Sequence, residues 1–375
     1  MKKLIQLLPI LLVLSIQSCQ KDSTEKADQN LQPENSRYTA PLNTGELTSR
    51  SGCDWTEIPA GSVDALADAI ASTCDNGVIY LRAGMHTENA VLTITKPVKI
   101  IGETGAVLRI HSELTPPDPT TGAFPVNPAL HVLNAPGFLL QDIELQPSGA
   151  DGGGALLLEN SHQSGVMRCK FTNFQYSIMV QKSDRTTIMF NTILANGAWQ
   201  TGGPNSYGIT IVNGESAYVS DNDVSNALFG IWACDRWGTA ERNNTHGNAV
   251  GLILCNVPAA LQFPDGFIGG SETPGTGWKV NNNTSTGNFD NGIMIIDGAN
   301  YNRVWNNQVH GNGLFPLAGT AADIESFDDS HLFGFDTPMA HDNYIDATSD
   351  PATTTRNCGM NNTFVGGTDI GGSCR

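Results

Sequence analysis

Positive charge is scarce in this sequence of 375 residues: 20 Lys and Arg stand against 37 Asp and Glu, a formal net charge of −17 at pH 7. Such an acidic chain repels the phosphate backbones of DNA and RNA, and no basic stretch interleaves with aromatic residues. We therefore expect no nucleic-acid partner. An anionic glycan would need a local basic patch or a bridging cation, so clusters of Lys and Arg become candidate sites.

The apolar run near the N-terminus is too short to span a bilayer. It extends from Leu4 to Ile16 and follows two lysines, which is the layout of a secretory signal peptide. The next residues, Gln17-Ser18-Cys19, resemble a bacterial lipobox, whose cysteine becomes the lipidated first residue; the alternative is ordinary secretion with Cys19 in a disulfide. We predict a signal peptide over residues 1–18, a polar tether over 19–50, and a cell-envelope location with membrane contact through the lipid anchor only.

One repeat dominates the sequence: an apolar triplet, a turn and then an asparagine, with a period of about 22 residues. The triplets are Leu156–Leu158, Ile178–Val180, Ile209–Ile211, Ile231–Ala233, Leu252–Leu254 and Ile293–Ile295. The asparagine column comprises Ile143, Cys169, Asn191, Asn222, Asn244, Asn283 and Asn307, and a looser second column comprises Asn226, Asn248, Asn288 and Asn312. Such a period indicates a solenoid, in which stacked amides bond from coil to coil. We interpret these asparagines as structural.

The N-terminal part adds a short helix and three strands. Ser62 is placed to cap a helix that runs through Ile70, and strands are predicted at 77–81, 91–94 and 98–102. This opening resembles the N-terminal cap of right-handed parallel β-helix proteins of the pectate-lyase-like superfamily, and the repeats resemble the Asn-rich repeats of the same group. We predict an all-β fold: a right-handed parallel β-helix over residues 51–345 with an N-terminal capping helix, and a C-terminal cap or tail over 346–375.

Seven cysteines follow Cys19, in a compartment where disulfides persist. Cys53 and Cys74 flank the N-terminal cap, and Cys358 and Cys374 flank the C-terminal tail. Cys234 and Cys255 occupy equivalent places in consecutive coils, which lie about 4.8 Å apart, so a bridge can join them. The remaining Cys169 is expected to be a buried free thiol.

Irregular spacings between the repeats locate three insertions, at about 197–207, 257–277 and 313–335. Alternation points the middle residue of each triplet outward, and this outer column is unusually apolar. The column contains His131, Leu157, Met179, Thr210, Trp232, Ile253 and Met294. Either the insertions cover the column, or it forms the floor of a groove that binds the flat faces of sugars. Trp199, Trp232 and Trp237 are the candidate stacking residues, with His131 at the edge.

A lysine interrupts the usual turn residue. Asn or Asp follows most triplets, as at Asn160 and Asp235, but Lys182 takes this place in its coil, with Arg185 nearby. In β-helix polysaccharide lyases, a Lys or Arg abstracts the proton next to a uronate carboxylate while other cations neutralise that carboxylate. The resemblance therefore implies Lys182, Arg185, Asp235 and Arg236 as candidate catalytic residues. The alternative is that they are solvated turn charges.

Other chemistries have weaker sequence support. The aspartates that hydrolysis would need lie in different columns, and the Asp-Pro-His-Asp signature of mannuronan epimerases is absent. An acidic segment from Asp323 to Asp329 could hold calcium, and no metal ligand is otherwise predicted. His246 is expected to be a buried core histidine.

The leading hypothesis is a cell-envelope protein acting on extracellular polysaccharide, with lyase-type elimination as the reaction. The second hypothesis is a non-catalytic glycan-binding or envelope-scaffolding protein. A third is metal delivery, like the periplasmic β-helix protein of nitrous-oxide reductase maturation, but the sequence shows no Met/His/Cys cluster for it.

Overall fold

The computed structural model describes residues 53–114, 124–150, 152–201, 205–254, 261–264, 275–289, 291–295, 299, 301–310 and 312, with short strands at 343–345, 358–360 and 363–364. The chain divides into two units, Met1–Arg50 and Ser51–Arg375. The predicted signal peptide, the tether and Cys19 lie outside the described residues, as do Cys255, Cys374 and the acidic segment 323–329. Within the described part, no helix is long and apolar enough to cross a membrane.

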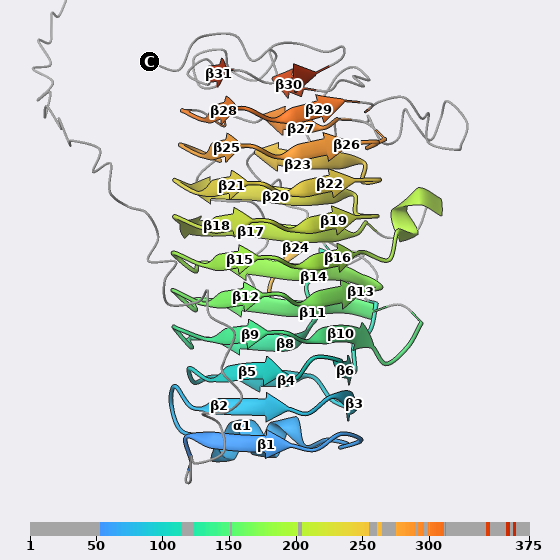
Figure 1. Ribbon diagram of the computed structural model, residues 1–375, viewed down its shortest axis with the longest axis vertical. Helices are drawn as coiled ribbons and strands as arrows, with labels where there is room; N and C mark the ends of the chain where they lie inside the picture. The colour runs from blue at the N-terminus through green and yellow to red at the C-terminus, as the bar shows by residue number, and fades with distance from the viewer. Residues whose placement is uncertain are drawn as a thin grey trace, which may run out of the picture. The chain divides into compact units, whose positions relative to one another are not determined.

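Three parallel sheets, here called A, B and C, stack rung above rung (Figure 1). Sheet A contains β1 (Trp55–Ile58), β2 (Val78–Leu81), β5 (Lys99–Gly102), β9 (Leu139–Gln141), β12 (Gly165–Met167), β15 (Thr187–Met189), β18 (Tyr218–Ser220), β21 (Thr239–Glu241), β25 (Lys279–Asn281), β28 (Arg303–Trp305) and β31 (Cys358–Met360). Sheet B contains β3 (Gly84–Glu88), β6 (Ala106–Ile110), β10 (Glu144–Pro147), β13 (Lys170–Thr172), β16 (Thr192–Leu194), β19 (Asp223–Ser225), β22 (Asn244–His246), β26 (Thr284–Thr286), β29 (Gln308–His310) and β32 (Thr363–Phe364). Sheet C contains β4 (Leu92–Ile94), β8 (Pro128–Leu133), β11 (Gly152–Glu159), β14 (Phe174–Gln181), β17 (Tyr207–Glu215), β20 (Phe229–Arg236), β23 (Val250–Leu254), β27 (Ile293–Ile295) and β30 (Asn343–Ile345).

The predicted parallel β-helix is therefore confirmed. Most strands of sheets A and B are three residues long, and alternation buries the middle residue while its two neighbours face outward. Val166, Ile188 and Val219 form such an inward column in sheet A, in register from β12 to β18. The inward columns of all three sheets meet in one continuous apolar core.

A ladder of buried asparagines lines the turn between sheets A and B. Its members are Asn191, Asn222, Asn243, Asn283 and Asn307. Each side-chain amide donates to the Oδ1 of the next asparagine, as from Asn222 to Asn243 at 2.9 Å. The same Oδ1 also accepts a backbone N–H, so turn groups that would be buried unpaired are satisfied. The structural interpretation of this column is correct.

One rung of the predicted ladder was wrong by one residue. Asn243 holds the buried position, whereas Asn244 pairs in register with Asp223 on sheet B and donates to its carboxylate at 2.8 Å. The same shift places Thr245, not His246, in the core column. His246 is instead 43% exposed, with Nε2 3.1 Å from Asp223 Oδ1. Two adjacent asparagines gave the sequence pattern no means to choose between them.

The second ladder contains Asn248, Asn288 and Asn312. Asn226 does not belong to it, because the backbone N–H of Ala227 donates to Asn248 Oδ1 at 2.9 Å and so takes that rung. Asn226 adopts a positive φ of 62° in the adjoining turn. Here too the predicted position differs from the observed one by a single residue.

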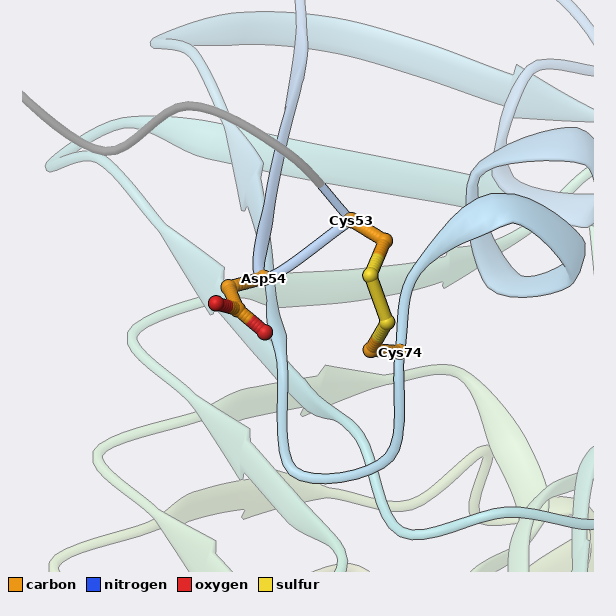
Figure 2. A group of neighbouring side chains, drawn as sticks. All are labelled: Cys53, Asp54 and Cys74. Atoms are coloured by element: carbon orange, nitrogen blue, oxygen red, sulfur yellow. A yellow bond between two sulfur atoms is a disulfide. The ribbon is translucent and has the colours of Figure 1, made fainter.

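The N-terminal cap is built around α1 (Leu66–Ser72). Ser62 does not cap this helix; its hydroxyl donates to the carbonyl of Pro59 at 2.6 Å. The carboxylate of Glu88 replaces it, because Glu88 Oε1 accepts the backbone N–H of Leu66 at 2.8 Å. The predicted Cys53–Cys74 disulfide is present and ties the chain before β1 to the end of α1 (Figure 2).

Two other cysteine predictions have different outcomes. Cys169 is a buried free thiol, as expected, and burial raises its pKa to about 12. Cys234 is buried on β20. The Cys234–Cys255 and Cys358–Cys374 bridges stay predictions, because Cys255, Cys374 and the side chain of Cys358 lie outside the described residues.

Candidate functional site

The outer face of sheet C is covered. Its predicted column runs in register through Leu157, Met179, Thr210 and Trp232, and each of these residues is at most 1% exposed. Leu157, Met179 and Trp232 belong to a second apolar cluster, separate from the core inside the coils. Of the two interpretations of this apolar column, covering is correct for these residues.

Inserted segments provide the cover. The strand β7 (Phe124–Pro125) pairs with β24 (Leu261–Gln262), and neighbouring Val126 and Phe263 join the outer cluster. The short 3-10 helix at Ala198–Thr201 adds Trp199. The insertion expected at 313–335 lies outside the described residues.

Trp232 and Trp199 are buried, so the expectation that they form an open stacking platform is wrong. Trp232 is 0% exposed and stacks on Tyr207 with ring centroids 5.0 Å apart. Trp199 is 7% exposed, and its indole N–H donates to the carbonyl of Asn226 at 2.9 Å. Both rings pack in the outer cluster, so neither exposes a face on which a ligand could stack.

The edge of this covered face holds a buried polar pair. His131 Nε2 lies 2.6 Å from Glu159 Oε2, and their side chains are 14% and 5% exposed. Glu159 faces Gln181 in register, and neither amide atom of the fully buried Gln181 hydrogen-bonds to the described structure. The sequence prediction found His131 but missed Glu159. Glu159 could have been found from its place in the sequence, because the residue directly after each triplet also points outward.

The remaining candidates lie at the turns that join sheet C to sheet A. These turns span residues 134–137, 160–163, 182–185, 213–216, 235–237, 276–277 and 301, and we call their solvent side the corner face. Lys182 occupies the same turn position as Asn160 and Asn213, and all three adopt left-handed φ values of 48–59°. Lys182 therefore occupies the structural position that asparagine holds in the neighbouring coils.

Charges of both signs alternate on the corner face. Lys182, Arg185 and Arg236 are exposed, and Glu215 pairs in register with Arg236. The backbone N–H of Glu215 donates to Asp184 Oδ1 at 3.1 Å, and the carbonyl of Glu215 accepts the N–H of Arg185 at 2.8 Å. The three predicted cations therefore share one face with two carboxylates between them.

Asp235 lies beneath this face and cannot contact a surface ligand, which contradicts its predicted catalytic role. Its turn is one residue shorter than the preceding one, so Asp235 stays in the strand β20 and lacks the positive φ of Asn213. It is 0% exposed, and neither carboxylate oxygen hydrogen-bonds to the described structure. Burial raises its pKa well above the usual value; the nearby charges of Asp184 and Glu215 act in the same direction, and together these effects outweigh the opposing influence of the Trp278 side chain.

Trp237 is the one predicted stacking residue that lies open to solvent, with 58% of its surface exposed. Its indole packs against Gly277 of the next coil, where an added Cβ would lie 2.1 Å from the ring atom Cε3. Gly277 also has a φ of +72°, which disfavours any residue with a side chain. The backbone of the next coil therefore holds the ring while one face remains accessible.

One group of possible metal ligands occurs among the described residues: Cys53, Asp54 and Cys74, with ligand atoms within 4.8 Å of one another. The two sulfurs are bonded to each other, as Figure 2 shows, so neither is a thiolate. This group therefore does not fit a metal ion.

A family model described as periplasmic copper-binding protein (NosD) matches residues 141–258. A search of curated proteins finds no match. Among solved structures, the periplasmic alginate epimerase AlgG is similar at 12% identity over 77% of each chain, with a TM-score of 0.40. The A-module of the Azotobacter vinelandii mannuronan C-5 epimerase AlgE4 is similar at 14% identity over 81% of this chain and 90% of its own, with a TM-score of 0.43. The pectin methylesterase of Aspergillus niger is similar at 13% identity over 87% and 93%, with a TM-score of 0.40.

The chain is a parallel β-helix protein. Its three in-register parallel ladders carry this conclusion, and the similar structures assign no activity to it.

Proposed function

We propose that this protein is a cell-envelope β-helix that binds an extracellular polysaccharide on its corner face. One observation carries the proposal: the exposed indole of Trp237, fixed against Gly277, stands beside the exposed guanidinium of Arg236 in an otherwise acidic chain. A fixed aromatic face stacks on the apolar face of a sugar ring at little entropic cost. An adjacent cation can bind the acidic groups of a glycan.

The envelope location rests on two supports. The N-terminal signal and Cys19 are those expected of a lipid-anchored secreted protein. The matching family model is described as periplasmic.

Binding has more support than elimination. A lyase needs a base and charge-neutralising groups around one substrate carbon. Lys182 and Arg185 are exposed and could touch a uronate, but Asp184 and Glu215 lie between them and Arg236. Lyase activity is thus the finer proposal, tested together with binding.

The decisive experiment measures binding of the purified protein to a panel of neutral and acidic polysaccharides. We expect Trp237→Ala to weaken binding about tenfold, which corresponds to about 1.4 kcal/mol. Phe190→Ala is the matched control, because Phe190 is also an exposed aromatic residue with positive φ, at the turn between sheets A and B. Equal affinity of Trp237→Ala and the unaltered protein would refute the site.

The same incubations test elimination. A lyase creates unsaturated uronate ends that absorb in the ultraviolet, and Lys182→Ala should abolish that signal. Binding without any new absorbance would leave the protein a glycan-binding module.

Copper binding is the second candidate, favoured by the family model that matches residues 141–258. Met167 and Met189 lie in register on sheet A and could offer soft thioether ligands to Cu(I). However, they are 1% and 5% exposed, and the one group of His, Cys and carboxylate ligands among the described residues, Cys53, Asp54 and Cys74, does not include them. Stoichiometric Cu(I) binding that is lost in Met167→Leu would favour this candidate, and no binding would reject it.

A further inference from the structure

A second exposed aromatic residue, Tyr301, lies in the same column as Trp237, and no sequence pattern assigned it a role. Tyr301 is 46% exposed and precedes β28 by the same two residues that separate Trp237 from β21 and Gly277 from β25. Because these strands pair in register, Trp237, Gly277 and Tyr301 lie in one column on three successive coils. Trp237 and Tyr301 are thus about 9.6 Å apart along the stack, with the side-chain-free Gly277 between them.

Two cations accompany this column. Lys279 and Arg303 each lie two residues after it, are exposed, and face each other in register on sheet A. Like charges directly opposite each other on neighbouring strands are destabilising. Thr239 continues the column without a carboxylate.

Some other arginines of the described chain are neutralised locally by ion pairs. Arg168 makes a bidentate pair with Asp142, and Arg242 makes one with Asp221. Lys279 and Arg303 have no such ion pair among the described residues. In a chain with net charge −17, two adjacent cations without a carboxylate partner mark a place where an external anion would be stabilised.

We propose that the corner face takes an acidic polysaccharide, whose sugar rings stack on Trp237 and Tyr301 while its carboxylates bind Lys279 and Arg303. This inference rests on the proposed polysaccharide-binding function and names its ligand class. The planar guanidinium of Arg303 suits a bidentate contact with a carboxylate, and Lys279 adds a point charge beside it. Stacking alone would accept neutral and acidic sugars equally, so the cations determine the selectivity.

A single-stranded nucleic acid also combines flat rings with negative charge. It is the less suitable ligand, because the bases that would stack are separated from the charged phosphates by the sugar. A uronate carries its carboxylate on the sugar ring itself, so its charge lies next to the saturated ring face that stacks on an aromatic residue.

The test compares affinities for a polyuronate, a neutral polysaccharide and single-stranded DNA. We expect Lys279→Gln/Arg303→Gln to weaken polyuronate binding more than tenfold and to reduce its dependence on salt. Affinity for the neutral polymer should stay the same. Tyr301→Ala should weaken binding of both polysaccharides.

The matched control is Lys99→Gln/Lys170→Gln. It also removes two positive charges: Lys99 lies on sheet A six coils before Lys279, and Lys170 lies on sheet B. If the control weakens polyuronate binding as much, a general charge effect overturns the inference. Tighter binding of DNA than of polyuronate would also overturn it.

The two levels of the proposal fail differently. If Trp237→Ala weakens polysaccharide binding but Lys279→Gln/Arg303→Gln has no effect, the corner face binds glycans without this selectivity. If neither variant has an effect, the polysaccharide site itself is wrong.

Discussion

Asp235 was predicted to be a catalytic residue at a surface turn, but the structure buries its side chain completely. It is fully buried, its carboxyl oxygens have no hydrogen-bond partner in the described structure, and its pKa is raised well above the usual value. A buried charge without a partner is costly, so the folded state favours the protonated acid. The neutral carboxylic acid is thus the form that the fold can accommodate.

This predicts a specific pH dependence. Because the folded pKa exceeds the unfolded one, the stabilisation from Asp235 is fully present below pH 3.8 and is lost as pH rises through the folded pKa. Asp235→Asn should remove this loss and make the protein more stable at pH 7 than the unaltered protein. Denaturation curves between pH 4 and pH 8 would measure it, with exposed Asp75→Asn as the control. An unchanged pH slope in Asp235→Asn would contradict the assignment.

Gly277 gives a second prediction at this scale. Gly277→Ala adds a methyl group where the Trp237 ring lies and also forces a side chain into φ +72°. Gly287→Ala separates the two effects, because Gly287 has a φ of +64° but no atom within 4 Å of the added Cβ. We expect both variants to lose about 1 kcal/mol of stability, and Gly277→Ala alone to shift tryptophan fluorescence and weaken glycan binding. Unaltered fluorescence and binding in Gly277→Ala would mean that the ring does not depend on this glycine.

At the scale of the elements, the asparagine ladder links each coil to the next. Asn243 Oδ1 accepts both the backbone N–H and the side-chain amide of Asn222. Its own amide donates to Val219 and to Asn283. Removing it therefore leaves several buried groups unpaired in two coils at once.

We expect Asn243→Ala to cost about 2–4 kcal/mol of unfolding free energy, since each unpaired buried group costs about 1–3 kcal/mol. Asn244→Ala is the neighbouring control and should cost less than about 1 kcal/mol, because its contact with Asp223 lies near the surface. Urea denaturation of the two variants measures the difference. Equal losses would mean that the ladder passes through the other residue.

The repeat in the sequence allowed strands and turns to be predicted. It did not determine which individual residue occupies each position of the asparagine ladder. The strands at 78–81, 92–94 and 99–102 follow directly from short apolar runs in the sequence. The choice between Asn243 and Asn244, by contrast, depends on a coil one residue shorter than its neighbours. A shift of one residue in a strand moves a side chain to the opposite face, which is why His246 was misplaced.

At the scale of the whole solenoid, the candidate site was only partly predictable. Trp237 and Arg236 carried a sequence signal, since an aromatic residue and a cation follow Asp235 at a predicted turn. Tyr301, Lys279 and Arg303 carried none by themselves, because only the stacking of coils brings residues from 237 to 303 into one column. The burial of Trp232 depended on segments that approach sheet C from distant parts of the sequence, which no local pattern records.

The pairing of β7 with β24 has a consequence for how the chain folds. Coils contact their neighbours in sequence, so the stack can grow rung by rung through local contacts. Phe124 meets Leu261 only after all the coils between them are in place. This long-range contact therefore forms later than the coils that lie between the two strands. Its formation would report that the intervening stack has reached its full length and correct register.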